Sequence, residues 1–184
     1  VQLGIGGIYY FLIAWLILQR SATRENKIFS LFFINVACGT VVNVIYAPLM
    51  INPLVLILHL VTYYLLSFGQ VFLLLFTLLL LKSQRIINTG MQVLIIFSFA
   101  VLLSGIFFLG LNGEVRIDNS TNWKPAWSLF FFLYAFCLCI FTCIIPTIYF
   151  SLKLRTRFEN KLIRKRYGYF LIGIGFYYFV WGGT

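Results

Sequence analysis

The stretch "LVLILHLVTYYLLSFGQVFLLLFTLLLL", residues 54–81, has the length and composition of a helix that crosses a lipid bilayer. It contains no Asp, Glu, Lys or Arg. A helix needs about 20 apolar residues to cross the roughly 30 Å hydrocarbon core. Residues 54–81 exceed that length, so we expect this helix to tilt or to extend beyond the lipid.

The composition of the whole chain agrees with this interpretation. Hydrophobic residues make up 62% of the 184 residues, charged residues only 10%, and the mean hydropathy is +0.99. A soluble domain of this size needs far more charge to cover its surface. We therefore predict an all-α fold, a polytopic transmembrane helix bundle that lies in the cell membrane as a multi-pass protein.

We predict six spans in one transmembrane domain that covers residues 1–184. They lie at about 1–18, 28–51, 54–81, 91–111, 127–152 and 167–181. The first span has cations after its apolar run and none before it, the reverse of a secretory signal, so we interpret it as a mature helix. The chain lacks an initiator Met and ends at "WGGT", which we interpret as truncation at both ends, with at least one more helix after Thr184.

The cations indicate which way the spans run. Of the fourteen Lys and Arg residues, three lie in 19–27, two in 82–90 and seven in 153–166, and these are alternate connections. Only Arg116 and Lys124 lie in the connections on the opposite side. Because Lys and Arg are retained on the cytoplasmic side of membrane proteins, we predict that the N-terminus lies outside. The same rule explains the net charge of +10 without a nucleic-acid partner, which we do not expect.

The acidic residues argue against several classes of membrane protein. The four acids, Glu25, Glu114, Asp118 and Glu159, are all predicted to lie in loops. Ion-coupled transporters and proton pumps usually carry an ionisable group inside the membrane. A retinal protein needs a Schiff-base lysine with a counter-ion, and the six spans offer neither.

No motif for catalysis, metal binding or a cofactor is recognisable in the sequence. Cys38, Cys137, Cys139 and Cys143 all lie in predicted spans, without a Cys-x-x-Cys motif or the ligand spacing of a zinc site. There are no paired carboxylates, no glycine-rich phosphate loop and no Ser/His/Asp or Cys/His arrangement. We therefore expect no enzymatic activity, no metal and no cofactor in this chain.

Polar residues inside two spans are the candidate site. His59, Tyr63, Ser67 and Gln70 fall on one face of the third helix, and Asn35 and Asn43 fall on one face of the second. Such residues must face protein or water in a membrane. Two explanations remain open, namely hydrogen bonds between helices and a ligand- or proton-sensing cavity. For a cavity we expect an opening between the outer halves of the second and third spans, beside His59 and under Trp123.

The order of these features resembles the seven-transmembrane N-terminal sensor region of membrane histidine kinases. The similarity is carried by "LQRSATRENKIFSLFFINVA", residues 18–37, by the long third span, and by "ENKLIRKRYGYFLIGIG", residues 159–175. The seventh helix and the kinase domain of that family are absent from this sequence. The resemblance implies a sensory input domain that passes a signal inward and names no particular ligand.

Two hypotheses follow for the function. The first is a signal-input domain of a histidine-kinase-like receptor, and the alternative is a small-molecule transporter or a structural integral membrane protein. A soluble signalling domain downstream of Thr184 would favour the first, and further spans would favour the alternative. The partners that we expect are the lipid bilayer, a small-molecule ligand and a second copy of the chain in a homodimer.

The predicted orientation can be tested by cysteine labelling from the two sides of the membrane. In a chain without its native cysteines, Asp118→Cys should react with an impermeant maleimide from outside. Arg24→Cys and Glu159→Cys should react only after the cytoplasmic side is opened, because the positive-inside rule places them there. Labelling of positions 118 and 159 from the same side would contradict the six-span topology.

Overall fold

The computed structural model describes the backbone of residues 2–182, and side chains within that range except those of 2–4, 82–86, 180 and 182. The first residue of the span predicted at 1–18 lies outside the described residues. The same holds for the last two residues of the predicted domain and for the side chains of Lys82 and Arg85, two of the cations counted above.

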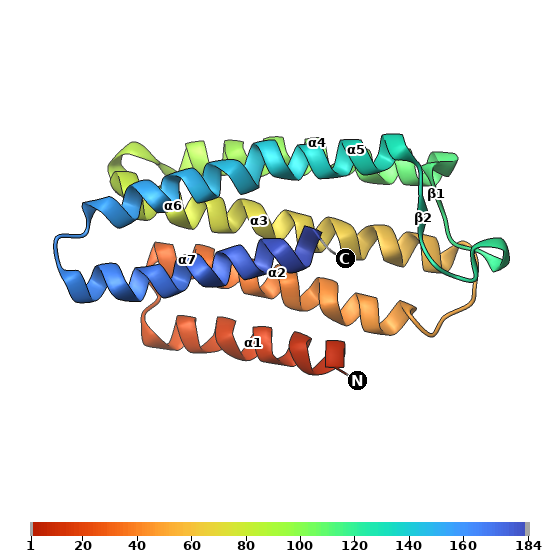
Figure 1. Ribbon diagram of the computed structural model, residues 1–184, viewed down its shortest axis with the longest axis horizontal. Coiled ribbons are helices and arrows are strands. Elements are labelled where there is room, and N and C mark those ends of the chain that lie inside the picture. The colour runs from red at the N-terminus through yellow and green to blue at the C-terminus, as the bar shows by residue number, and fades with distance from the viewer. Residues whose placement is uncertain (1, 183–184) are drawn as a thin grey trace.

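Residues 2–182 form an all-α bundle of six helical rods, which confirms the predicted fold class (Figure 1). Five rods are single helices: α1 (Gln2–Arg20), α2 (Arg24–Tyr46), α3 (Leu54–Ile86), α4 (Thr89–Leu109) and α7 (Lys161–Gly182). The fifth rod along the chain consists of α5 (Leu129–Cys139), a π-helical turn (Ile140–Ile144) and α6 (Ile145–Arg157). Four segments are long and apolar enough to cross a membrane: Arg24–Tyr46, Leu54–Leu81, Thr89–Glu114 and Leu129–Arg157.

Two predicted boundaries differ from the structure because local capping and proline chemistry outweigh hydropathy. α2 starts at Arg24, not at residue 28, because the Thr23 hydroxyl accepts the backbone N–H of Asn26. Glu25 therefore lies in the first turn of a helix rather than in a loop. α2 also ends before residue 51, because Pro48 lacks an N–H and restricts the residue before it.

The basic stretch at 153–166, predicted to connect two spans as a loop with flanking helix ends, is almost entirely helical. α6 continues to Arg157 and α7 starts at Lys161, so only 158–160 connect the two helices. The Asn160 side chain accepts the backbone N–H of Leu162 at 2.8 Å and so caps α7.

The fifth rod widens into a π-helical turn just before Pro146. Proline cannot donate the backbone hydrogen bond that an α-helix requires at that position, and such turns absorb the defect. The Thr142 hydroxyl donates to the Leu138 carbonyl at 2.6 Å. The Thr147 hydroxyl has no hydrogen-bond partner among the described atoms.

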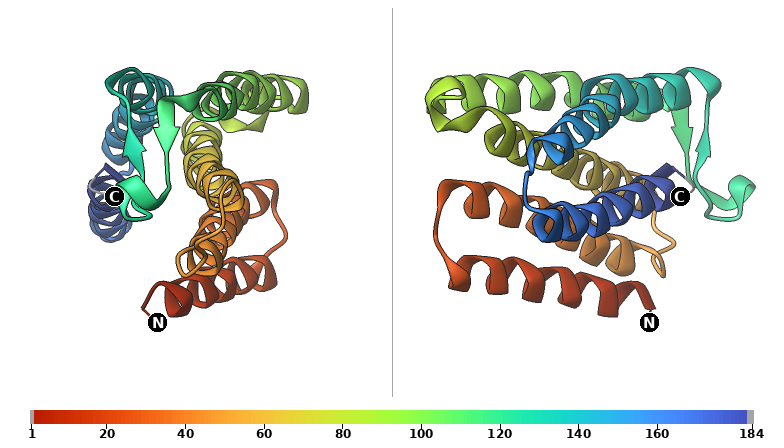
Figure 2. Two further views of the ribbon diagram at one scale, coloured as in Figure 1. Left: turned by 90° about the vertical axis from the view of Figure 1, so that its right-hand side faces the viewer. Right: turned by 60° about the vertical axis from the view of Figure 1, so that its left-hand side comes forward.

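α3 lies at the centre of the bundle. Viewed from one end, it runs between α2 on one side and α4 on the other, with α7 beside it (Figure 2). In its most apolar window 61% of the residues are buried, against at most 33% in the other three membrane-length helices. Every other helix is therefore positioned, directly or through α2, by the side chains of α3.

The connections gather at two opposite ends of the bundle (Figure 1). One end, here called the basic end, holds the links α1–α2, α3–α4 and α6–α7. The other, here called the hairpin end, holds the α2–α3 link and the two-stranded sheet of β1 (Val115–Arg116) and β2 (Ala126–Trp127). The ends of α1 and α7 nearest the termini point the same way.

A short capped turn closes the hairpin between the two strands. The Asp118 carboxylate accepts the backbone N–H groups of Ser120 at 2.8 Å and Thr121 at 3.2 Å. The Ser120 hydroxyl also donates to it, and these bonds lower the pKa of Asp118 below its usual value. Local hydrogen bonds therefore shape the turn, while Val115 and Ile117 of the hairpin are buried in the hydrophobic core of the bundle.

Close packing of α2 on α3 depends on Gly39. A Cβ atom at Gly39 would lie 2.9 Å from the Leu66 Cγ atom, shorter than a normal van der Waals contact. We expect Gly39→Ala to lower the free energy of unfolding by about 1–3 kcal/mol, the usual cost of overpacking. Steric trapping in lipid bicelles would measure it. Gly175→Ala is the matched control, because a Cβ there meets open space; equal stability losses in both variants would contradict this account.

Candidate functional site

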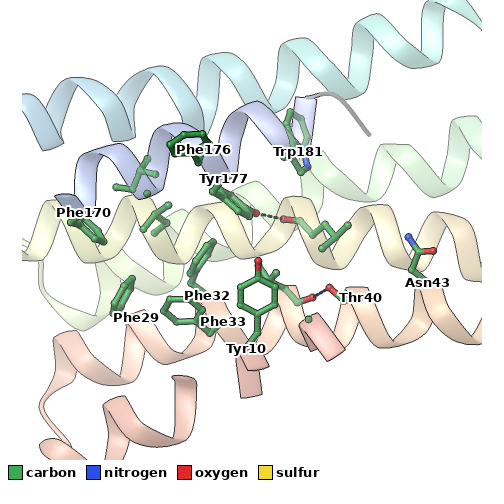
Figure 3. Close-up of a pocket in the computed structure, with 16 residues that line it drawn as sticks. Tyr10, Phe29, Phe32, Phe33, Thr40, Asn43, Phe170, Phe176, Tyr177 and Trp181 are labelled. Atoms are coloured by element: carbon green, nitrogen blue, oxygen red, sulfur yellow. Dashed lines mark hydrogen bonds between the residues drawn. The ribbon is translucent and has the colours of Figure 1, made fainter. Parts of the chain in front are cut away.

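An aromatic pocket of about 600 Å³ lies between α1, α2, α3 and α7. Its volume falls within the range of about 300–1,000 Å³ that is typical of small-molecule sites. α2 and α3 form its floor, and α1 and α7 line its two sides (Figure 3). Among the lining residues are Phe29, Phe32, Phe33, Phe170, Tyr177 and Trp181.

The half of the pocket toward the basic end is apolar and largely aromatic. Phe29 contacts the ring of Phe170 on α7, with ring centroids 5.8 Å apart in an edge-to-face arrangement. Phe32 meets Tyr177 in the same way at 5.0 Å. These contacts hold α7 above α2 by the width of a ring rather than by close backbone packing, which leaves space between the helices.

The half toward the hairpin end carries the polar groups. Asn43 and Trp181 lie at that end in Figure 3, and the hydroxyls of Tyr10 and Thr40 lie between it and the aromatic half. The Thr40 hydroxyl donates to the Val36 carbonyl at 2.7 Å, so its oxygen lone pairs can still accept. The described residues that line the pocket include no Asp, Glu, Lys, Arg or His. The pocket therefore suits an uncharged molecule with an apolar body and one polar end.

Both ring nitrogens of His59 are bonded within the protein. The Trp127 indole N–H donates to His59 Nε2 at 3.1 Å, and the Tyr46 hydroxyl oxygen lies 2.9 Å from His59 Nδ1. Because an indole can only donate, Nε2 carries no proton and the proton of the neutral ring is on Nδ1. The Tyr46 oxygen thus accepts from Nδ1. His59 joins the α2–α3 corner to the hairpin, and a ligand would have to displace one of these bonds to reach it.

The other candidate residues are distributed along the helix interfaces. Tyr63 contacts the ring of Trp127 at 5.2 Å between centroids, whereas Ser67 and Gln70 are fully buried. The Asn35 amide donates to the Leu31 carbonyl of its own helix at 2.8 Å. Of the six residues singled out from the sequence, only Asn43 is among the residues that line this pocket.

The pocket lies elsewhere than the cavity expected beside His59 and Trp123. Its residues come from the middle of α2 and α3 and from α1 and α7. The sequence does contain a signal for it, because the aromatics at 29, 32 and 33 share one face of α2. That signal is weak in a chain with 21 Phe residues, because most such stripes pack against lipid or other helices.

The ionisable groups do not gather into a metal or redox centre within the described residues. No cluster of three or more His, Cys, Asp or Glu side chains with metal-binding geometry occurs among them. The four cysteines are free thiols, and Cys139 and Cys143 are fully buried.

Comparison of this chain with protein-family models, curated proteins and solved structures gives no match. The resemblance to histidine-kinase sensor regions therefore stays a prediction. The functional argument has to come from the pocket and from the groups around it.

The His59–Trp127 bond gives a testable energetic coupling. Trp127→Phe removes the indole N–H that donates to Nε2 and should lower the free energy of unfolding by about 1–3 kcal/mol, since a buried acceptor then loses its donor. Combined with His59→Leu, the loss should be less than additive by about 1 kcal/mol in a double-mutant cycle. Trp123→Phe is the matched control. Trp123→Phe and His59→Leu should give additive losses of stability. If Trp127→Phe and His59→Leu were also additive, the bond would contribute nothing to stability.

Proposed function

We propose that this chain is a membrane-embedded input domain that binds an uncharged amphiphile in the pocket between α1, α2, α3 and α7. The main support for this proposal is the shape and chemistry of the pocket, which has aromatic rings at one end and Tyr10, Thr40 and Asn43 toward the other. A long-chain alcohol, amide or monoacylglycerol has this polarity. Such molecules partition into the bilayer, so they can reach a pocket that opens between helices.

Burial of α7 against the pocket supports a role in signalling. α7 contributes Phe170, Tyr177 and Trp181 to the pocket, and at the basic end it continues directly into 158–160 and α6. A ligand that binds better to one position of α7 than to another shifts the population between them. The neighbouring helices are tied together at that end. Arg157 donates to the Leu81 carbonyl at 2.9 Å, and Arg24 donates to Thr89 at 2.8 Å.

The proposal includes the orientation predicted from charge. With the basic end on the cytoplasmic side, the polar end of the pocket lies toward the outer surface and α7 runs outward from the cytoplasm. The resemblance to the sensor regions of histidine kinases agrees with this arrangement, because in such proteins the signal passes inward.

Transport of small neutral molecules is the second candidate function. It is favoured by buried polar groups along α3 and the fifth rod, of which Gln70 and Thr147 are fully buried with no hydrogen-bond partner among the described atoms. An uncharged polar solute could use such groups in turn. Proteoliposomes that bind the amphiphile but show no flux of glycerol or urea would favour the input domain.

Filling the pocket should abolish ligand binding without unfolding the protein. A Cβ at Gly173 meets no atom within 4 Å, although Gly173 lines the pocket, so the side chain of Gly173→Leu should enter the cavity. We expect this variant to lose at least ten-fold in photo-crosslinking of a diazirine-labelled hexadecanol. Peptide mass spectrometry should place the wild-type crosslinks on Phe29, Phe33 or Phe170.

Gly175→Leu is the matched control, since it lies on the same helix in open space but does not line the pocket. It should crosslink like the wild type. Competition separates a specific site from lipid filling, because excess hexadecanol should displace the probe and excess hexadecane should not. Equal crosslinking of both leucine variants would contradict the proposed site.

A further inference from the structure

The pocket between α1, α2, α3 and α7 is closed by three aromatic rings at the end that lies toward the basic end of the bundle. Phe29 of α2 and Phe170 of α7 line the pocket there, and Phe76 of α3 packs against both from outside it. Phe29 and Phe76 are stacked, with ring centroids 4.3 Å apart. Phe170 meets both rings edge-to-face, at 5.8 Å from Phe29 and 6.0 Å from Phe76. We call these three residues the ring triad.

The ring triad leaves no passage beyond the pocket. Each ring belongs to a different helix, and aromatic rings with centroids this close are packed against one another. Among the described residues that line the pocket, none precedes Phe29 on α2 or Phe170 on α7. The space between these helices therefore stops at the triad.

Neighbouring rings hold the triad in place. Phe33, one turn further along α2, meets Phe29 edge-to-face with ring centroids 5.0 Å apart. Within α7, Tyr167 contacts Phe170 with ring centroids 5.3 Å apart. A ring that is packed on several sides loses these contacts if it swings away. The triad therefore closes the pocket as a fixed stop rather than as a loose side chain.

The distance between the two ends of the pocket can be measured along α2. Asn43 lies at the polar end in Figure 3, and Phe29 lies at the closed end of the same pocket. These two residues are fourteen positions apart, which corresponds to about 21 Å at a rise of 1.5 Å per residue. An extended hexadecanol molecule has about this length, whereas docosanol is distinctly longer.

We propose that the ring triad sets the maximum chain length of the bound amphiphile. The pocket would then select molecules with a single chain about as long as that of hexadecanol. This inference rests on the proposed function, because it takes the polar head to lie beside Asn43 and the chain to run toward Phe29.

Chain length matters because packing depends on fit. A chain that just reaches the triad packs against the pocket along its whole length. A longer chain has to bend or leave the pocket sideways, and it then loses part of that packing. In an apolar pocket, one methylene group that does not fit changes the affinity by about ten-fold or more.

Competition between alcohols, in the intact protein in nanodiscs, would measure this selectivity. The probe is the diazirine-labelled hexadecanol, and the competitors are hexadecanol and docosanol, each given as a mole fraction of the lipid. In the wild type, docosanol should need about a ten-fold higher mole fraction than hexadecanol to halve the crosslinking.

Opening the triad should reduce this ratio. Phe29→Ala removes a ring from the closed end, and the ratio should fall at least about five-fold because the cavity then continues toward the basic end. Phe170→Ala makes the same opening from α7, so the test does not depend on one variant folding. Phe176→Ala is the matched control, since Phe176 lines the pocket on α7 about 9 Å further toward the hairpin end. It should weaken the binding of both alcohols alike and leave the ratio unchanged.

The same experiment separates this inference from the proposed function. If hexadecanol does not displace the probe from the wild type, the proposed function fails and the inference fails with it. If hexadecanol displaces the probe and docosanol does so equally well, the pocket binds amphiphiles but the triad does not limit their length. An unchanged ratio in both Phe29→Ala and Phe170→Ala, or an equal shift in Phe176→Ala, would likewise overturn the inference and leave the proposed function standing.

Discussion

Because α3 is buried at the centre of the bundle, its polar side chains need hydrogen-bond partners on the surrounding elements. His59, near its start, is bonded on both sides, by Tyr46 of α2 and by Trp127 of the hairpin. This bond, the ring contacts of Trp127 and the burial of Val115 and Ile117 in the bundle core hold the hairpin over α3. Where α3 meets α2, Gly39 of α2 packs against Leu66 and allows the two backbones to approach closely.

The pocket is a consequence of how α7 is held. α2 lies close to α3 because Gly39 packs against Leu66 and Gly69 packs against Asn35, but α7 meets α2 and α3 through aromatic side chains. The Tyr177 hydroxyl of α7 donates to the Leu66 carbonyl of α3 at 3.2 Å. The length of the tyrosine side chain therefore separates the two helix backbones at this point. The aromatic rings therefore keep α7 apart from α2 and α3. The space between these helices stays open because residues such as Gly173 have no side chain to fill it.

Hydropathy was sufficient to predict six helices, because each apolar run is long and the charges fall between the runs. Hydropathy did not predict the end of α2 before Pro48 or the start of α7 at the Asn160 cap. A single proline or capping residue hardly changes the mean hydropathy of the surrounding residues. The polar face of α3 was readable from helical periodicity. The pocket was not, because its aromatic residues come from α1, α2 and α7 and a single sequence does not show which helices are neighbours. For the same reason the partners of His59, 13 and 68 residues away, could not be predicted.

The position of α7 between two different environments gives the pocket a physical route to the rest of the bundle. On one side its neighbours are the aromatic rings of the pocket, which pack with weak directionality, and on the other Tyr178 and Tyr167 lie near the hydroxyls of Thr147 and Ser151 on α6. Tyr177 and Tyr178 are adjacent in sequence, so a rotation of α7 that makes room for a ligand at Tyr177 also moves the hydroxyl of Tyr178 relative to Thr147.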